Sequence, residues 1–331
     1  MSPISKVAVF GASGNFGTPI TAALIKAGFD VTIFTRPAAS SSTPTTARST
    51  FPASAGSVVE VADYGDVACL TAALAGHEAV VSVLGPGAIA HEVLLVDAAE
   101  AAGVQRFIVN DFGWGQNPRS FPEMLEVGAR RHVAWDRAKE KAAANSAFTW
   151  TGITIGNPID WPLRAPTTNL GSHIQALRKF SKMGFSVAEH TAVIYDSGAE
   201  HFTGTTLEGI GQSVVGVLNH PEETANRFVK ARSIKTCQSE LLEAFQSETS
   251  GRHDWTVTHE KVADLLEGGM QKHKAGDRGW ILDLLVTQLY EEGSARCVVA
   301  ASREDSDAEL LGIREETARE VAAKALGQTA M

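Results

Sequence analysis

The chain predicts an α/β fold with a doubly wound parallel sheet, followed by a smaller α+β part, and three observations support this prediction. Short β-branched runs alternate with helical segments, several of those segments stop at a glycine, and the first run leads into a glycine-rich turn. The expected strands of the sheet are Val7–Phe10, Val31–Thr35, Val58–Val61, Ala79–Leu84, Phe107–Asn110 and Phe148–Ile155. The expected helices between them are Pro19–Ala27, Val67–Ala75 and His91–Ala102. Because strands and helices alternate, the strands should run parallel with helices on both faces of the sheet.

Two stretches interrupt this alternation. Residues 37–56 are rich in Ser, Thr, Ala and Pro without an apolar period, which predicts a loop. Residues 157–191 carry scattered Pro, Gly and polar residues, which suits a loop-rich lid over a binding site. A strand returns at Ala192–Tyr195, and Thr205–Glu208 forms a capping box that opens a helix through Leu218. The remaining expected elements are strands at Phe228–Ala231 and Trp255–Thr258 and helices near Ser239–Ser247, Glu260–Gly268, Trp280–Glu291 and Glu315–Ala325.

Composition places the 331-residue chain among ordinary globular proteins, because 44% of its residues are hydrophobic and 20% are charged. The formal net charge of −9 argues against nucleic acids and anionic membranes as partners. No apolar run of about 20 residues and no signal peptide is found, so we expect a cytoplasmic protein. The cysteines, Cys69, Cys237 and Cys297, are isolated and are expected to be reduced thiols. The ten histidines show no metal-ligand spacing, so no metal site is expected.

The segment Gly11–Gly17 gives the strongest functional signal, because its G-x-x-G-x-x-G spacing lies between an apolar strand and a helix. Glycines in a first βα turn let the backbone approach a pyrophosphate, and the N-terminus of the following helix offers N–H donors. We therefore expect this turn to bind a dinucleotide. The contributing residues are expected to be Gly11, Ser13, Gly14, Asn15, Phe16 and Gly17.

The end of the second strand predicts which dinucleotide binds. Enzymes that prefer NAD place Asp or Glu there to bond the ribose 2′-hydroxyl, whereas this chain has Thr35 and Arg36. A guanidinium suits a 2′-phosphate, so NADP(H) is the expected cofactor. Arg48 in the predicted loop either adds a second contact or is a solvated surface arginine.

Further groups follow the other strands at the same edge of the sheet, where ligands bind in open α/β folds. Asp63, Leu84 and Gly85 either flank the bound cofactor or make ordinary turns at the strand ends. Asn110 is expected beside the cofactor and Asp111 beside the reacting groups, although each could instead cap the loop that follows.

Several segments carry a likeness to one family of oxidoreductases. In the first half these are GASGNFG at the first turn, FTR after the second strand, VVSVLG and RFIVNDFG. In the second half they are FTWTGITIGNPIDW, TAVIYDSG and FTGTTLEGIGQSVVGVLNHPEETANR. With these motifs the chain resembles the NmrA-like and isoflavone reductase-like branch of the atypical short-chain dehydrogenase/reductases, and its fungal members above all.

The resemblance implies an NADPH-binding Rossmann domain, a smaller substrate domain and the reduction of phenolic or other aromatic metabolites. It implies that residues 1–156 and 192–226 form the NADP-binding domain, and that residues 157–191 and 227–331 form the substrate-binding domain. The family's cofactor roles transfer to Gly11, Gly14, Gly17 and Arg36. Its Ser-Glu-Phe-Gly after the fifth strand corresponds here to Asn110–Gly113.

The chain departs from the family at the proton donor. Reductases of this branch use a lysine on the helix before the sixth strand, whereas this region reads Arg130–Trp135 without a lysine. No tyrosine is followed four positions later by a lysine: Tyr64, Tyr195 and Tyr290 all fail this test. The family lysine falls near His132, which could donate a proton to the reduced group or be a partly exposed helix residue. Lys139, on the same predicted helix face, could assist it or be solvated. His132 and Asp111 are therefore the expected catalytic residues.

Three functions fit these observations. The leading one is an NADPH-dependent reductase of a small aromatic or conjugated carbonyl compound of secondary metabolism. The alternatives are an NADP-binding redox sensor without turnover, which the missing lysine favours, and a non-redox isomerase or dehydratase. Trp114, Trp135 and Trp161 either form a flat wall for an aromatic substrate or pack in the core. The sequence leaves a homodimer open.

Overall fold

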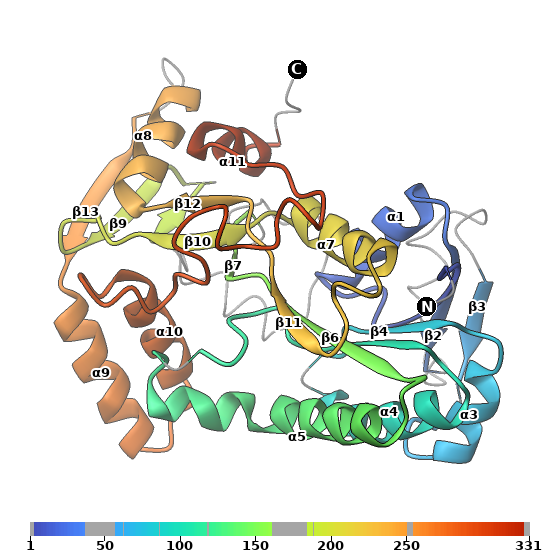
Figure 1. Ribbon diagram of the computed structural model, residues 1–331. Coiled ribbons are helices and arrows are strands. Elements are labelled where there is room, and N and C mark those ends of the chain that lie inside the picture. The colour runs from blue at the N-terminus through green and yellow to red at the C-terminus, as the bar shows by residue number, and fades with distance from the viewer. Residues whose placement is uncertain are drawn as a thin grey trace, which may run out of the picture.

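The computed structural model describes residues 3–36, 57–61, 63–85, 87–117, 119–160, 184–187, 189–249 and 254–327. Its centre is a seven-stranded sheet in the order β11-β6-β5-β4-β1-β2-β3, in which every neighbouring pair runs parallel (Figure 1). These strands are β1 (Lys6–Phe10), β2 (Asp30–Thr35), β3 (Ser57–Glu60), β4 (Ala79–Ser82), β5 (Arg106–Val109), β6 (Thr149–Thr154) and β11 (Arg227–Lys230). The prediction of a Rossmann-like parallel sheet is confirmed. The strand order reverses between β1 and β4, which is where open α/β sheets bind their ligands.

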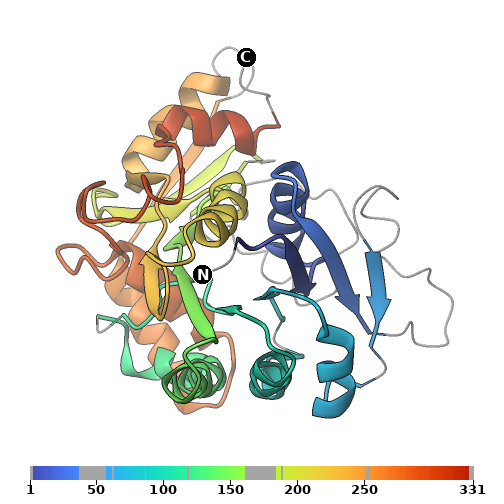
Figure 2. The same ribbon diagram turned by 45° about the vertical axis from the view of Figure 1, so that its right-hand side comes forward.

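Helices cover both faces of this sheet, as Figure 2 shows from a second side. Those on one face are α1 (Gly17–Lys26) and α7 (Leu207–Asn219), and those on the other are α3 (Val67–Leu74), α4 (Glu92–Ala101) and α5 (Pro122–Ala144). In β1, Val7 and Val9 join the core under α1 and α7, whereas Ala8 and Phe10 join the core under the other helices. All four side chains are fully buried, which explains why the strand reads as a continuous apolar run.

The C-terminal part adds two small sheets, in the orders β12-β10-β7 and β13-β9-β8. Their strands are β7 (Asn157–Pro158), β8 (Phe185–Ser186), β9 (Thr191–Tyr195), β10 (Phe202–Thr205), β12 (Ile234–Thr236) and β13 (Thr256–Glu260). The helices here are α8 (Gln238–Thr249), α9 (Val262–Lys274), α10 (Trp280–Tyr290) and α11 (Ala318–Ala325). Buried aromatic residues such as Phe202, Phe245 and Tyr290 lie in the core between them. This part is the smaller α+β unit that the sequence predicts.

Strand pairing divides the chain differently from the expected domain boundaries. The resemblance places residues 192–226 in the dinucleotide-binding domain, but β9 pairs with β8 and β13, and β10 pairs with β7 and β12. Conversely, β11 lies within residues 227–331 and is the edge strand of the central sheet, because it pairs with β6. We therefore propose that only α7 and β11, residues 207–230, return to the dinucleotide-binding part.

The N-cap of α7 lies one residue later than the predicted capping box. The Thr206 hydroxyl accepts the Gly209 N–H at 3.2 Å, whereas the Thr205 hydroxyl donates to the Ile155 carbonyl at 2.7 Å. Glu208 forms an ion pair with Lys324 at 2.8 Å instead of closing the box. The prediction of the helix was correct and that of its cap was wrong, since adjacent threonines offer equivalent local signals that tertiary contacts separate.

A buried arginine ties the last strand to the rest of the central sheet. Arg106, at the start of β5, is fully buried and donates to the hydroxyls of Thr149, Thr151 and Thr224, each at 2.9 Å. It also donates to the carbonyl of Pro221. Burial lowers the pKa of its guanidinium to about 10, so the charge is retained at neutral pH among neutral oxygens.

Candidate active site

The glycine turn follows β1 and requires glycine for steric reasons. Gly11 has φ +86°, and a Cβ there would lie 2.3 Å from the Val83 carbonyl oxygen after β4. A Cβ on Gly17 would lie 2.0 Å from the Gly11 carbonyl oxygen, although one on Gly14 would meet that oxygen only at 3.2 Å. The first glycine therefore allows the turn to approach β4, and the third allows α1 to start directly against the turn.

The start of α1 suits an anionic group. It has no side-chain cap and no acidic residue in its first turn. The partial positive charge at the N-terminus of α1 is therefore not neutralised by a carboxylate of the same helix. Ser13 and Gly14 are exposed and Asn15 is half-buried. All six predicted residues of the turn therefore lie together at the strand-order reversal, in an arrangement that fits a dinucleotide pyrophosphate.

The predicted phosphate-selecting residue lies at the end of β2. Arg36 is exposed, and its charge acts on the neighbouring Tyr64, a buried phenol. Burial raises the pKa of Tyr64 to about 12, and Arg36 opposes that shift. Asp63 is exposed, and its Oδ1 accepts the Gly65 N–H at 2.7 Å, which is ordinary turn chemistry. Its contact with a cofactor stays a prediction. Arg48 lies outside the described residues.

Asn110 joins the ends of β4 and β5. Its side-chain amide donates to the Leu84 carbonyl at 2.6 Å, and its backbone N–H donates to Glu92 Oε1 at 2.7 Å. Glu92, at the start of α4, is fully buried, and burial raises its pKa to about 7 despite the Asn110 bond and the charge of Arg131. The side chain of Asn110 is thus engaged in holding the strand ends, while Gly85 beside Leu84 remains exposed.

Asp111 holds the loop after β5. Its Oδ1 accepts the Gly115 N–H at 3.1 Å and its Oδ2 accepts the Thr154 hydroxyl at 2.8 Å. Burial raises the Asp111 pKa to about 6, opposed by the Thr154 bond and by Arg131. The next residue, Phe112, has φ +39°, a conformation that is costly for a side chain with a Cβ. Because both carboxylate oxygens of Asp111 are hydrogen-bonded, the loop after β5 is held in one conformation.

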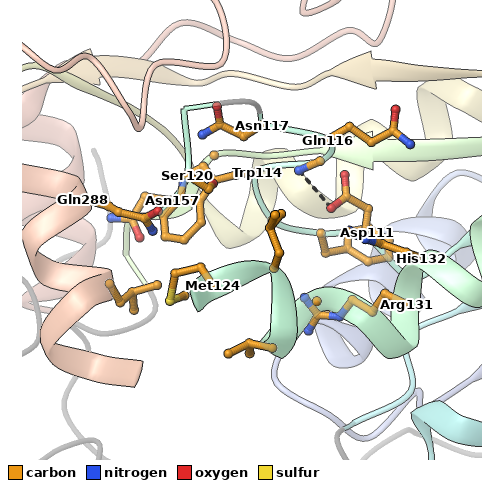
Figure 3. A pocket seen from close by; sticks show the side chains of 18 of the residues that line it. Asp111, Trp114, Gln116, Asn117, Ser120, Met124, Arg131, His132, Asn157 and Gln288 are labelled. Carbon is orange, nitrogen blue, oxygen red and sulfur yellow. Dashed lines mark hydrogen bonds between the residues drawn. The ribbon is translucent and has the colours of Figure 1, made fainter. Parts of the chain in front are cut away.

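A cavity of about 520 Å³ opens between this loop, α5 and α10. Figure 3 shows His132 of α5 next to Asp111, with Met124 and Arg131 on the same helix and Gln288 on the α10 side. Apolar walls come from Trp114, Trp135, Met124, Leu125, Ile281 and Leu285. Both predicted catalytic residues, His132 and Asp111, therefore line one cavity, as do two of the three predicted tryptophans. Trp161 lies outside the described residues.

His132 lies against the indole ring of Trp135, with ring centroids 4.6 Å apart. The Trp135 Nε1–H lies 3.4 Å from the Asn110 carbonyl, so the indole links the histidine to the end of β5. Lys139 does not line the cavity, and instead its Nζ pairs with Asp136 at 2.8 Å on the same helix. Of the two basic candidates on α5, His132 lines the cavity and Lys139 does not, and the catalytic role of His132 stays a prediction.

The cavity and the glycine turn are neighbours. The rings of Phe16, in the turn, and Phe112, in the cavity wall, have centroids 6.5 Å apart. A ligand in the cavity therefore lies next to any ligand that extends from the turn along the sheet edge.

Sequence reasoning missed the wall that α10 contributes. Ile281, Leu285 and Leu289 repeat every four residues, which predicts a buried face but not the surface that it meets. The Gln288 Oε1 accepts the Phe121 N–H at 2.8 Å, which attaches the start of α5 to the C-terminal part. The cavity is thus closed by a contact that joins residues far apart in the sequence.

Comparisons with known proteins identify the family and agree with the fold. A family model described as NAD(P)H-binding matches residues 11–195. Oxidoreductase poxI of Penicillium oxalicum is 54% identical over 315 residues, which cover 95% of this chain and 92% of that protein. A solved structure of AtPrR2 with NADP⁺ and (+)-pinoresinol superposes with a TM-score of 0.71 at 17% identity, covering 98% and 100% of the two chains. A crystal structure of isoflavone reductase gives 0.71 at 18% identity, with 97% and 99% covered.

In the described part of the chain, no helix has the length and apolar character that crossing a bilayer requires.

Proposed function

Because the chain belongs to the NAD(P)H-binding family and resembles the isoflavone reductase-like oxidoreductases, we propose that it is an NADPH-dependent reductase of a small aromatic or conjugated carbonyl compound. One observation carries this proposal: a cavity with indole and aliphatic walls contains His132 and Asp111 and adjoins the glycine turn. The indole and aliphatic part of this lining favours an aromatic or conjugated substrate, and its polar side chains could bond the substrate's oxygen atoms.

The residues present fit NADPH. The Gly11–Gly17 turn and the start of α1 would hold the pyrophosphate, and Arg36 would hold the 2′-phosphate. When bound, NADPH supplies a hydride from C4 of its nicotinamide ring. A charge-assisted bond contributes about 1.5–3 kcal/mol, so Arg36 should favour NADPH over NADH by roughly ten- to a hundredfold.

His132 serves in this proposal as the proton donor to the substrate oxygen, since reduction of a carbonyl leaves negative charge on that atom. Trp135 fixes the position of the imidazole by packing against it. Asp111 acts through its bonds to Gly115 and Thr154, which hold the loop wall in place, and is thus a positioning residue.

A second candidate is a redox sensor that binds NADPH without turnover. One observation favours it: no lysine lies among the described residues that line the cavity, although reductases of the resembled branch use one. The two candidates predict the same cofactor binding and differ in whether a substrate is converted.

The test is turnover with NADPH that carries deuterium at C4, against a panel of quinones, enones and aryl ketones. We expect deuterium in the product. Conversion without label would support an isomerase or dehydratase, and NADPH binding without conversion would support the sensor.

His132→Gln tests the proton donor. It should lower kcat by about a hundredfold while leaving the Kd for NADPH unchanged, because the imidazole acts on the substrate oxygen. Lys139→Ala, on the same helix but outside the cavity, is the matched control and should keep full turnover. Unchanged kcat in the His132 variant would remove this residue from the mechanism.

A further inference from the structure

The fold brings together three metal-ligating side chains that the sequence separates. Histidine spacing predicted no metal site, yet His201, Cys237 and Glu240 each place one ligand atom within 4.8 Å of the other two. They lie in the C-terminal part, where β10, β12 and α8 meet (Figure 1). None of the three lines the cavity described above.

Strand register and helix periodicity produce this meeting. The antiparallel pair β10 and β12 places Phe202 opposite Thr236, so His201 and Cys237 fall opposite each other just beyond the paired residues. The Cys237 carbonyl accepts the Leu241 N–H at 3.2 Å, which makes Cys237 the N-cap of α8. Glu240 follows three positions later, about one helical turn away, and therefore faces the same side. The cross-strand pair His201 and Cys237 and the helix residue Glu240 thus supply the three metal-ligating groups.

Neighbouring groups orient two of these donors. The Thr236 hydroxyl donates to Glu240 Oε2 at 2.8 Å, which leaves Oε1 facing His201 Nε2 at 3.6 Å. Burial raises the pKa of the Cys237 thiol, and the backbone N–H groups of Glu240 and Ser239, which donate to its sulfur, oppose that shift. Metal ligands in proteins are commonly held by such outer hydrogen bonds, which fix their direction and stabilise a thiolate.

The exposure of the three side chains suits an ion that enters from solvent. Cys237 is 4% exposed, whereas the His201 and Glu240 side chains are 47% and 49% exposed. The two exposed side chains can therefore adjust to ligand distances of about 2.0–2.3 Å while the sulfur stays fixed.

We propose that His201, Cys237 and Glu240 bind a divalent cation of the zinc class, with water as the fourth ligand. One sulfur, one imidazole nitrogen and one carboxylate oxygen are the donor set that Zn²⁺ accepts and that Mg²⁺ and Ca²⁺ do not. The ion would join β10, β12 and α8, and it would stabilise the C-terminal part without contacting the cavity. Binding releases the Cys237 thiol proton to solvent, so the affinity should rise with pH.

The experiment uses the full chain, stripped of metal with a chelator and titrated with Co²⁺ as a spectroscopic substitute for Zn²⁺. We expect a thiolate-to-cobalt charge-transfer absorption that saturates at one equivalent and disappears when Zn²⁺ displaces the cobalt. Cys237→Ala should abolish the absorption, whereas Cys69→Ala, at a half-buried cysteine outside the cluster, should leave it unchanged.

His201→Ala and Glu240→Gln should each weaken Co²⁺ binding by roughly tenfold or more. Because both side chains are half exposed, these variants should fold, which the unfolding temperature without metal would verify. At the same Zn²⁺ concentration, the rise in Tm should be larger for the natural chain than for the His201 variant. Absence of the charge-transfer absorption in the natural chain, or its survival in the Cys237 variant, would overturn the proposal. Hydride transfer does not enter any of these measurements, so the result is independent of the proposed reductase activity.

Discussion

The glycine turn and the cavity lie at the same edge of the central sheet but depend on different kinds of interaction. The turn is one local segment whose shape is set by backbone contacts, such as the 2.0 Å approach that a Cβ on Gly17 would make. The cavity is assembled from the loop after β5, from α5, from β7 and from α10. A rigid backbone cannot yield to an added atom, whereas side chains on several elements can share a displacement. Small substitutions in the turn should therefore cause large losses of stability or cofactor binding. The shape of the cavity should change mainly when the residues that hold its walls in place are replaced.

The largest expected effect is that of Gly17→Ala. Its methyl group would meet the Gly11 carbonyl oxygen, a backbone atom that cannot move aside without disrupting the turn. We expect a loss of unfolding free energy of about 3 kcal/mol or more and loss of NADPH binding by at least about a hundredfold. Urea unfolding and calorimetry measure the two effects.

Gly14→Ala is the matched control, because its methyl group would approach the same oxygen only to 3.2 Å. It should cost less than about 1 kcal/mol. Equal losses in the two variants would show that the turn is not sterically restricted in the way described.

The next largest effect is expected at Glu92, which accepts the Asn110 N–H at the end of β5. Burial raises the pKa of Glu92 to about 7 from its ordinary value of 4.5, so the folded state holds this proton more tightly than the unfolded state does. The free energy of unfolding should therefore fall as pH rises from about 4.5 to 7, by up to about 3 kcal/mol from this group.

Glu92→Gln removes the titration but keeps an acceptor for the Asn110 N–H. The variant should be more stable than the natural chain at pH 8, and the difference should shrink toward pH 5. Urea unfolding at both pH values measures it. Identical pH dependence in the two proteins would show that Glu92 ionises normally in the fold.

A smaller effect is expected at the end of β2. Arg36→Ala should weaken NADPH binding by roughly ten- to a hundredfold and leave NADH binding nearly unchanged, because only NADPH carries the 2′-phosphate. Calorimetric titration with each dinucleotide measures the contrast. Equal weakening of both would mean that Arg36 does not recognise the 2′-phosphate.

The smallest effect is expected at the end of β3. Asp63→Ala removes the 2.7 Å bond to the Gly65 N–H and should lower the unfolding free energy by about 0.5–1 kcal/mol. NADPH affinity should stay the same if turn formation is its whole role. A severalfold loss of affinity would instead support its predicted contact with the cofactor.

The sequence could predict the turn because its three glycines lie within seven consecutive residues after an apolar strand. It could also place His132 and Asp111 near one sheet edge, since both follow from the positions of β5 and α5. It could not predict that Asp111 would be anchored by Gly115 and Thr154, because the second contact depends on strand pairing. The contribution of α10 to the cavity wall could not be predicted either, since an apolar period identifies a buried face without identifying the surface that it packs against.

The same limit explains why the sequence did not indicate the partner of β11 or the proximity of His201 and Cys237. Strand β11 joins the central sheet through register with β6, and His201 meets Cys237 through register between β10 and β12. Register across distant strands leaves no periodic signal in either segment.

Arg106 has a consequence for how the molecule can be divided. Two of its acceptors, the Thr224 hydroxyl and the Pro221 carbonyl, lie more than a hundred residues beyond it in the chain. A fragment that ended after residue 156 would keep the Thr149 and Thr151 hydroxyls but lose both of these oxygens, so the buried cation would have fewer acceptors. We therefore expect the central sheet to be less stable in such a fragment than in the full chain, because residues 207–230 supply both of these oxygens and the edge strand β11.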